Sequence, residues 1–190
     1  MRKAALQSRL LTLKKAGLKV VAVDHEGLAL ERALPNSSAV IDIGHERTSL
    51  HYYGEAVPRS AHCLSGGAEI TRAVERELCL NKESAEKRKC TLGTLGAGDS
   101  ARVALTLKLS HLFEEMVQER PRPQRITLVG NGSRLEGIAA ELERHTGVFV
   151  ATCMPQIMSS EAYCTQTSQA SAADWSLAIG LSVWGMAADY

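Results

Sequence analysis

Residues 126–134 read ITLVGNGSR, and this stretch decides the fold class. Its first four residues form a continuous run suited to a strand that is buried on both faces of a sheet. The glycines at 130 and 132 then allow a tight turn and a close approach of the backbone to a neighbour, before a helix expected to reach about residue 145. Leu135 stands where a dinucleotide-binding G-x-G-x-x-G motif would need its last glycine, so that motif is excluded. A buried strand, a glycine turn and a helix predict an α/β domain.

Two other junctions have the same design. Residues 39–43 (AVIDI) form a second apolar run, expected as the central strand, and lead through Gly44 to Thr48. Asp42 lies at the end of this strand, where a carboxylate can reach hydrated Mg²⁺ and where the amides of a glycine turn can hold an anion. The third junction, residues 65–67 (SGG), opens a helix, and helix N-termini attract anions. Taken singly, the junctions at residues 41–44 and 65–67 are more simply a glycine turn and a flexible helix start, whereas the one at residues 128–134 is the most specific of the three.

The other segments predict a mixed sheet with helices on both faces. The expected strands cover residues 20–23, 39–43, 49–53, 57–64, 126–129 and 148–152. The expected helices cover residues 6–15, 25–34 with Asp24 as cap, 67–78, 82–91, 99–119, 134–145 and 173–186. Residues 159–173 are rich in Ser, Thr and Gln and are expected to form a surface loop.

Two of these helices have an expected packing side. In the helix over residues 99–119 it is formed by Val103, Leu107, Ser110 and Met116. In the last helix it is formed by Ala178, Leu181, Trp184 and Gly185, and both Trp175 and Trp184 are interpreted as packing residues.

Composition excludes several classes of function. The chain has 190 residues, 45% of them hydrophobic and 23% charged, with 22 Lys and Arg against 21 Asp and Glu. A net charge of +1 and an aromatic content of 4% argue against nucleic-acid binding. No apolar run is long enough to span a membrane, and the N-terminus is not that of a signal peptide. Five cysteines without a C-x-x-C pair fit a reducing compartment, and the histidines have no metal-ligand spacing.

The order of the three junctions resembles the second half of the actin-like ATPase superfamily, which has a ribonuclease H-like fold. Residues 42–44 (DIG) are similar to its second phosphate loop, and residues 130–132 (GNG) to its adenosine loop. Arg134 stands where chaperone relatives place an arginine against the adenine. Glu86 and Lys89 resemble the pair that contacts the ribose and adenine in those chaperones.

Within the superfamily, the chain most resembles the PilM family of type IV pilus assembly proteins, and FtsA-like division proteins more distantly. The segments that carry this resemblance are residues 16–24, 29–33, 42–44, 64–71 and 85–86, with residues 178–181 similar to the last helix of the fold. The match implies that residues 1–36 are the tail of an inserted subdomain and its connection, and that residues 37–190 are the second actin-like domain. The N-terminal half of such a protein would then be missing, so the chain is either a fragment or naturally truncated.

The resemblance also implies a function. PilM-like proteins are cytoplasmic and peripheral at the inner membrane, bind a bitopic PilN-like partner and link the pilus motor to the assembly platform; actin-like folds also often self-associate. The resemblance implies ATP and Mg²⁺ as cofactors, with weak or no hydrolysis by this chain, because no residue is a clear candidate for activating a water. The implied cofactor-binding residues are Asp42 (also towards Mg²⁺), Gly44, Thr48, Gly66, Gly67, Glu86, Lys89, Gly130, Asn131, Gly132 and Arg134.

The sequence departs from the family pattern after Gly44, where His45, Glu46 and Arg47 replace small residues. Glu46 would place a like charge near a triphosphate, and Arg47 would either compensate this charge or pair with Glu46. Asn131 stands where relatives often have Gly, a milder change because Asn tolerates left-handed turns. Two alternatives therefore remain open: a nucleotide-free scaffold, or a relative that works in type II secretion or cell division. The direction of Glu46 relative to the cleft separates the first alternative from ATP binding.

Overall fold

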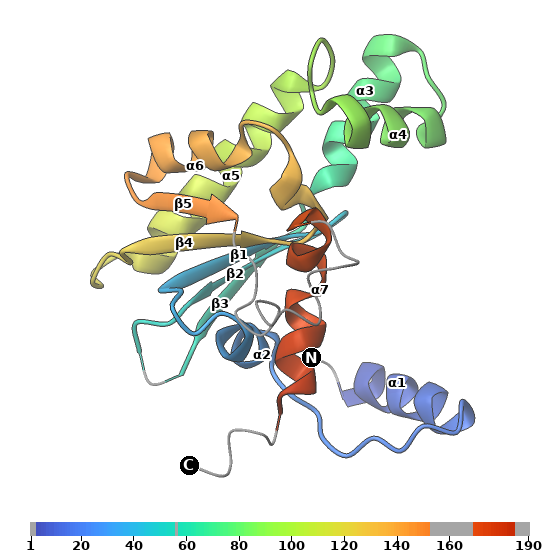
Figure 1. The fold of residues 1–190 in the computed structure, drawn as a ribbon, viewed down its shortest axis with the longest axis vertical. Coiled ribbons are helices and arrows are strands. Elements are labelled where there is room, and N and C mark those ends of the chain that lie inside the picture. Colours follow the sequence, from blue (N-terminus) through green and yellow to red (C-terminus); the bar gives the residue numbers. More distant parts are fainter. Residues whose placement is uncertain (1–2, 56, 153–168, 185–190) are drawn as a thin grey trace.

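A mixed sheet of five strands forms the centre of the computed structural model, which describes residues 3–55, 57–152 and 169–184 (Figure 1). Its order is β3 (Arg59–Cys63), β2 (Thr48–Tyr52), β1 (Ala39–Ile43), β4 (Arg125–Val129) and β5 (Phe149–Thr152). The β1–β2 and β2–β3 pairs are antiparallel, whereas β1–β4 and β4–β5 are parallel. The α/β class and the central place of residues 39–43 are confirmed.

Helices cover both faces of this sheet, as predicted (Figure 1). On one face lie α5 (Asp99–Val117) and α6 (Ile138–Thr146). Leu109 and Phe113 of α5 share a core with Ile41 of β1. On the other face, α2 (Glu26–Ala33) and α7 (Gln169–Ser182) enclose Val40. The strand alternation explains this division, because successive side chains of β1 point to opposite faces.

A small helical layer lies beyond the sheet, at the end where β1 and β4 finish. It contains α3 (Gly67–Leu78) and α4 (Lys82–Leu92), which pack through Val74 and Ala85. The short 3-10 helix η1 (Asn131–Arg134) follows β4 at the same end. This arrangement places three segments that are distant in sequence around one end of the sheet.

The first helix, α1 (Lys3–Lys15), has no buried residue and stands away from the body (Figure 1). Gly17 ends it with a left-handed backbone at φ +78°. The strand predicted over residues 20–23 is wrong: this segment is irregular, and Val21 is 76% exposed. Alternating valines form a strand only when a partner strand accepts their backbone hydrogen bonds, and none lies beside them among the described residues.

Helix α2 begins one residue later than a cap at Asp24 would place it. His25 is the cap, and its Nδ1 accepts a hydrogen bond from the Gly27 amide at 3.1 Å. Asp24 instead accepts from the His25 amide and pairs with Arg32. The helix itself and its end before Pro35 are confirmed.

The predicted packing side is partly right for α5 and wrong for α7. In α5, Ser110 and Met116 are buried as predicted, but Leu107 is 38% exposed, and the fully buried residues Leu105, Leu109 and Phe113 were not predicted. In α7, Leu177, Ile179 and Gly180 face α2, whereas Ala178 and Leu181 are exposed. In α7, apolar and small residues occur all round the helix, so its sequence gives no periodic signal for the buried side, which is decided by its neighbours.

The end of the chain differs in other details. Trp175 and Trp184 are 58% and 49% exposed, so among the described residues they are not core residues. Residues 169–173 belong to α7 and not to the predicted loop; residues 159–168 of that loop, and Gly185, lie outside the described residues. No helix in the described part of the chain combines the length and the apolarity that crossing a bilayer requires.

Candidate functional site

The carboxyl ends of β1 and β4 meet at one edge of the sheet. The two strands are parallel, with Asp42 opposite Val129, and the chain then leaves them in opposite directions. Such a switch in strand order opens a crevice outside the carboxyl ends of the strands, the usual position of a ligand in an α/β sheet. The loops after Ile43 and Val129 therefore form the floor of the candidate site.

Gly130 and Gly132 allow these two loops to touch. Gly130 has a positive φ of +79°, and a Cβ there would lie 2.2 Å from Asp42 Oδ1. A Cβ on Gly132 would lie 2.2 Å from Ile43 Cγ2 and 2.9 Å from the Ile43 carbonyl oxygen. Both glycines are therefore required by the contact between the loops, whether or not a ligand binds.

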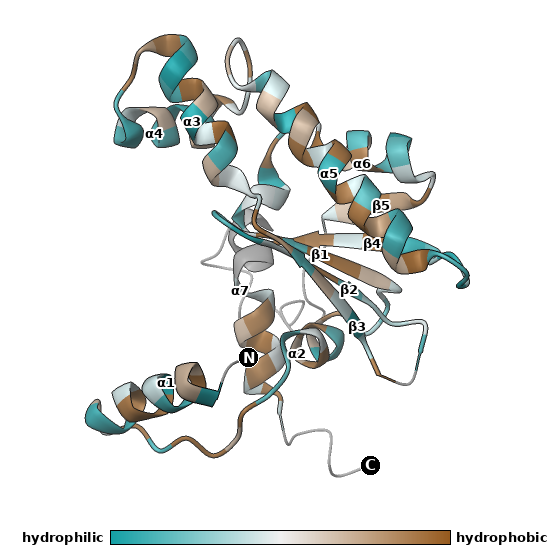
Figure 2. Ribbon diagram, turned by 180° about the vertical axis from the view of Figure 1, so that it is seen from behind, coloured by the Kyte–Doolittle hydropathy of each residue, from teal (hydrophilic) through white to brown (hydrophobic). Residues whose placement is uncertain are grey.

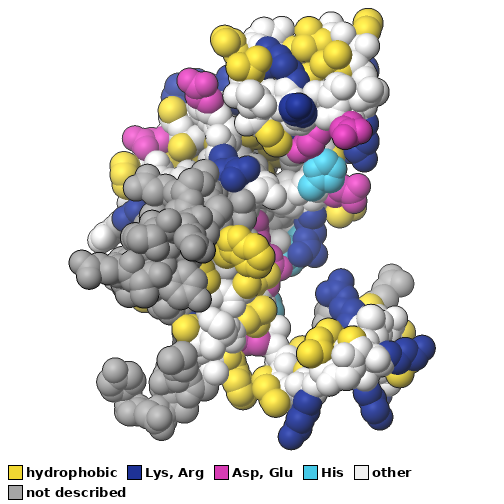
Figure 3. All heavy atoms as spheres, turned by 45° about the vertical axis from the view of Figure 1, so that its right-hand side comes forward, with side chains coloured by type: hydrophobic (Ala, Val, Ile, Leu, Met, Phe, Trp, Pro, Cys, Tyr) yellow, Lys and Arg dark blue, Asp and Glu magenta, His cyan; other side chains and the backbone are white. Residues whose placement is uncertain are grey.

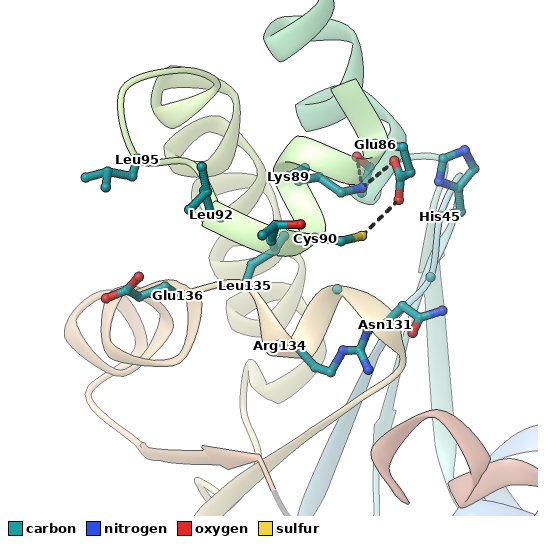
Figure 4. Close-up of a pocket in the computed structure, with 15 residues that line it drawn as sticks. His45, Glu86, Lys89, Cys90, Leu92, Leu95, Asn131, Arg134, Leu135 and Glu136 are labelled. Carbon is teal, nitrogen blue, oxygen red and sulfur yellow. Dashed lines mark hydrogen bonds and ion pairs between the residues drawn. The ribbon is translucent and has the colours of Figure 1, made fainter. Parts of the chain in front are cut away.

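A cavity of about 490 Å³ opens above this floor, beneath α4 (Figure 4). Three segments line it: the turn after β1, the second half of α4 with the turn that follows, and η1 with the residues after it. The lining residues are Gly44, His45, Gly67, Glu86, Lys89, Cys90, Thr91, Leu92, Gly93, Leu95, Asn131, Gly132, Arg134, Leu135 and Glu136. Its size lies within the range of small-molecule sites, and its lining combines leucines with a few polar groups, as such sites do.

Lys89 holds the wall of this cavity together. It is only 7% exposed, and its Nζ donates to the Gly67 carbonyl oxygen at 3.2 Å, to Thr71 Oγ1 at 2.9 Å and to Glu86 Oε2 at 2.8 Å. Thr71 also donates to the same Glu86 oxygen. A buried ammonium group requires such partners, and here they join α3 to α4.

Glu86 carries a negative charge at the edge of the cavity. Partial burial opposes its ionisation, but the hydrogen bonds from Lys89 and Thr71 outweigh burial and lower the pKa of its carboxyl group. Cys90 Sγ donates to the other oxygen, Oε1, at 3.6 Å (Figure 4). Burial and the Glu86 charge raise the pKa of the Cys90 thiol, which keeps it protonated and unreactive at neutral pH. A carboxylate in this setting can accept hydrogen bonds from ligand hydroxyl groups.

The N-terminus of α3 uses its amides differently from the sequence-based expectation. The Gly67 amide donates to the Gly44 carbonyl oxygen at 3.0 Å, and the Ala68 amide donates to that of His45 at 2.7 Å. The Glu69 amide donates to the Gly66 carbonyl oxygen at 3.1 Å. The first amides of the helix therefore hold the turn after β1 by direct backbone bonds and leave an anion few donors at this helix end.

The structure brings most of the predicted site residues together. The cavity is lined by Gly44, Gly67, Glu86, Lys89, Asn131, Gly132 and Arg134. Asp42 and Gly130 lie below its floor, and Gly66 packs its backbone against the Gly44 carbonyl oxygen. Thr48 is fully buried, and its Oγ1 donates to the Ser65 carbonyl oxygen at 2.8 Å, so this hydroxyl group has a structural partner.

The three residues after Gly44 have different surroundings in the structure. His45 lines the cavity, whereas Glu46 is exposed and is not among the lining residues. Arg47 pairs with neither Glu46 nor a site residue: its Nη2 lies 3.4 Å from Glu26 Oε2 of α2. The expected repulsion between Glu46 and a ligand is therefore weaker than the sequence suggests.

Sequence analysis missed Cys90, Gly93, Leu135 and Glu136 as lining residues. The helical spacing i, i+4, i+7 from Glu86 places Cys90 and Gly93 on the same side of α4, so this signal was available. Leu135 and Glu136 directly follow the predicted loop. Among the described residues, no group of three or more His, Cys, Asp or Glu side chains can hold a metal ion.

Comparison with known proteins places this geometry in a fold family. No family model and no curated protein sequence matches the chain. Among solved structures, it is similar to one titled "PilM-PilN type IV pilus biogenesis complex", with a TM-score of 0.79 and 28% identity over 97% of this chain and 58% of that chain. It is also similar to MreB 5 of Spiroplasma citri bound to AMPPNP, with a TM-score of 0.72 and 14% identity over 98% of this chain and 66% of that one.

A third similar structure is the ethanolamine utilization protein EutJ from Carboxydothermus hydrogenoformans, with a TM-score of 0.67 and 19% identity over 90% of this chain and 60% of that chain. The chain thus spans about 58–66% of the length of these three structures. The likenesses establish the actin-like fold that the sequence predicted.

Proposed function

We propose that this chain, whose actin-like fold is PilM-like, is a component of a type IV pilus assembly platform. In this role it binds the adenosine end of ATP and serves as a scaffold for a bitopic membrane protein. Residues 37–190 would be its second actin-like domain, and residues 1–36 the tail of an inserted subdomain with its connection. The proposal rests on the similarity over 97% of the chain to the structure of a PilM–PilN complex.

One observation carries the nucleotide part of the proposal: three distant segments converge on one cavity at the switch point of the sheet. Its residues fit an adenosine group. Glu86 presents an ionised carboxylate that can accept hydrogen bonds from ribose hydroxyl groups. Arg134 offers a planar guanidinium for the base, and Leu135 offers an apolar wall.

The fit is poorer for the phosphates and for Mg²⁺. The first amides of α3 donate to the carbonyl oxygens of Gly44 and His45 and not to the cavity. Asp42 is a single carboxylate at the end of β1, so it would hold Mg²⁺ only together with phosphate oxygens and water. We therefore propose that ATP acts as a conformational ligand, with weak or no hydrolysis by this chain. When bound, ATP would supply the charge that draws the two halves of an intact relative together.

The proposed partner is a PilN-like bitopic protein with a short cytoplasmic tail. A chain that binds such a tail would work in the cytoplasm, peripheral at the inner membrane. The support is the similarity to PilM in a structure that contains PilN. A binding assay between the full chain and cytoplasmic tail peptides of pilus membrane proteins tests this role. Binding of a PilN-like tail supports it, and binding of only secretion or division tails contradicts it.

A nucleotide-free scaffold is the second candidate function. The bonds from Gly67 and Ala68 to the turn after β1 favour it, because they close one of the expected phosphate contacts with the protein's own backbone. In that case the cavity would be a remnant of the fold. The two functions make opposite predictions for nucleotide titration.

Isothermal titration with Mg-ATP distinguishes them, using two tryptophan variants on the exposed surface of α4. Cys90→Trp places an indole in the cavity, whereas Ser84→Trp places one on the same helix outside it. We expect micromolar binding to the wild type and to Ser84→Trp, and binding at least about tenfold weaker to Cys90→Trp, a difference of about 1.4 kcal/mol. Absence of binding at millimolar ATP, or equal binding to all three proteins, supports the scaffold.

A further inference from the structure

Three histidine rings lie close together at the start of α2, and none of them lines the cavity. The ring centroids of His25 and His51 are 6.2 Å apart, and those of His51 and His62 are 6.3 Å apart, both in edge-to-face orientation. His25 precedes α2, whereas the other two belong to β2 and β3. Figures 1 and 2 place α2 beside α7 on this face of the sheet. The histidines therefore occupy the contact between the start of α2 and the neighbouring strands.

His25 holds the first turn of α2 only in its neutral form. Its Nδ1 accepts a hydrogen bond from the Gly27 amide at 3.1 Å and so caps the helix. A proton on Nδ1 would turn this acceptor into a donor and would break the cap. It would also place a positive charge at a helix N-terminus, where the backbone dipole disfavours a cation. The cap therefore depends on the protonation of one imidazole.

His51 is fully buried next to this cap. Its Nδ1 lies 2.7 Å from Ser60 Oγ, whereas its Nε2 has no hydrogen-bond partner among the described residues and lies 3.9 Å from Glu26 Oε1. The ring also touches the first turn of α2, since a Cβ on Gly27 would lie 2.9 Å from His51 Nδ1 and 3.2 Å from His25 Nδ1. A proton on Nε2 would face a carboxylate, but it would also lie beside a second imidazole.

Other charged and titratable side chains surround the rings. They come from the start and body of α2, the turn after β1, the residue after β2, and β3: Asp24, Glu26, Glu31, Arg32, Arg47, Tyr53 and His62. Asp24 and Arg32 pair with each other, and Tyr53 stays neutral because burial raises the pKa of its hydroxyl group. Glu26 is left to face both the rings and Arg47, whose Nη2 lies 3.4 Å from its Oε2. Figure 3 shows histidine, acidic and basic side chains near one another between the helical layer and α1.

The third histidine makes further protons unfavourable. Partial burial and the Arg47 charge lower the pKa of the His62 imidazole, and Glu26 opposes this shift. The other two histidines lower this pKa further. The stability that neutral His62 contributes is therefore present above the ordinary imidazole value of 6.5 and is lost as the pH falls. Up to three imidazolium groups and Arg47 would share one nearby carboxylate, so protons favour a state in which the rings separate.

We infer that the start of α2, residues 25–27, is a pH-sensitive latch. It is closed while His25 is neutral and its Nδ1 holds the Gly27 amide, and it opens when the histidines take up protons below neutral pH. Glu26 connects the latch to Arg47, and the Arg47 carbonyl oxygen accepts a hydrogen bond from the Gly44 amide at 3.0 Å. Opening therefore also loosens the turn after β1. The inference is independent of the proposed function, because the latch uses no residue of the cavity.

Hydrogen exchange of two matched alanine amides, followed by NMR in the full chain, tests this inference. Ala29 and Ala85 are both fully buried. The Ala29 amide donates to the carbonyl oxygen of the α2 cap, His25, at 3.1 Å. The Ala85 amide donates to that of the α4 cap, Asn81, at 2.9 Å. The Asn81 side chain caps its helix without titrating, so Ala85 is the control once rates are corrected for the intrinsic effect of pH.

Two variants separate the cap from the other histidines of the chain. His25→Asn keeps a side-chain acceptor at the cap but removes the titration, and Asn is a favoured residue at this position. His111→Gln changes an exposed histidine of α5 and is the matched control. Circular dichroism verifies that both proteins are folded at each pH.

Between about pH 7.5 and about pH 5.5 we expect the protection of the Ala29 amide to fall about tenfold in the wild type and in His111→Gln, the effect of one imidazole proton taken up on opening. In His25→Asn the fall should be less than about threefold, and the protection of Ala85 should change by less than about threefold in all three proteins. Constant protection of Ala29 in the wild type overturns the inference. So does an equal fall at Ala85, which indicates loss of the whole fold, or a fall in His25→Asn as large as in the wild type.

Discussion

Two glycine junctions of this protein look alike in sequence and are used in opposite ways. After β4, Gly130 and Gly132 let the backbone pass closely over β1, and the following residues turn towards the cavity. Before α3, Gly66 and Gly67 lie against the turn after β1, and here the helix amides bind the carbonyl oxygens of Gly44 and His45. The first junction leads into the cavity, whereas at the second the helix amides are bound by the protein's own backbone.

The difference shows what a glycine motif predicts. Glycine indicates that something approaches the backbone closely, but it does not indicate whether that neighbour is a ligand or the protein itself. At Gly66, a Cβ would lie 2.5 Å from the Gly44 carbonyl oxygen, so the neighbour is the protein's own turn. In the proposed nucleotide site, the side at η1 is therefore better formed than the side at α3.

The largest effect is expected from a substitution in the junction after β4. Gly132→Val would push Cβ and its methyl groups into Ile43, whose Cγ2 lies 2.2 Å from the Cβ position. We expect a loss of about 3 kcal/mol or more in the free energy of unfolding, because both Ile43 and its backbone are fixed in the sheet. Urea denaturation followed by circular dichroism measures the loss.

Gly67→Ala is the matched control for this variant. Its Cβ would lie 3.3 Å from Lys89 Nζ, the end of a long side chain that can shift. We expect a change below about 1 kcal/mol. A similar loss in both variants would contradict the difference in contact between Gly132 and Gly67.

Lys89→Met tests how the cavity wall is held. It removes the ion pair with Glu86 and leaves that carboxylate with donors from Thr71 and Cys90 only. We expect a loss of about 2 kcal/mol at pH 7, because a partly buried charge loses its main partner. Urea denaturation at several pH values measures it.

The pH dependence of that loss follows from Glu86. Its pKa is lowered in the folded protein, so the stability that it contributes is present above the ordinary carboxyl value and is lost as the pH falls. The difference between wild type and Lys89→Met should therefore shrink in acid. A difference that does not change between pH 7 and pH 3 would show that Lys89 acts through packing alone.

Glu26→Gln tests the contact between α2 and the turn after β1, where Arg47 pairs with Glu26. His51 lowers the pKa of the Glu26 carboxyl group; burial opposes this shift, Ser49 and Arg47 add to it, and the pKa falls from 4.5 to about 2. Glu26 therefore stabilises the fold above pH 4.5, and this contribution is lost as the pH falls towards 2. We expect Glu26→Gln to lose about 1–2 kcal/mol at neutral pH and to approach the wild type near pH 2. Acid titration followed by circular dichroism compares the two, and a constant gap would contradict the role of the charge.

The sequence predicted the sheet well because its central strands are short apolar runs that end in glycine. Residues 39–43 and 126–129 needed no tertiary information, since continuous burial and turn residues define both ends. The failures have a common cause. Residues 20–23 have strand composition but no partner strand, and α7 is apolar on every side, so only the folded chain decides which side is covered.

The candidate site was predictable to a similar extent. The resemblance to actin-like proteins selected Glu86, Asn131 and Arg134, and these residues line one cavity. It did not predict that Arg47 would pair with Glu26 of a preceding helix, because that contact depends on where α2 lies against the sheet. Nor did it predict the use of the α3 amides, since backbone hydrogen bonds leave no mark in side-chain identity.

The smallest expected effect gives the sharpest test of the comparison. If the adenosine side is formed and the α3 amides are taken by Gly44 and His45, additional phosphates should add little affinity. We expect AMP, ADP and Mg-ATP to bind with dissociation constants within about threefold of one another, a spread of about 0.7 kcal/mol. Isothermal titration under one set of conditions measures all three, with Cys90→Trp as the control for binding in the cavity. An affinity that rises tenfold or more with each phosphate would mean that the turn after β1 opens and releases the α3 amides to the ligand, and both glycine junctions would then serve the same purpose.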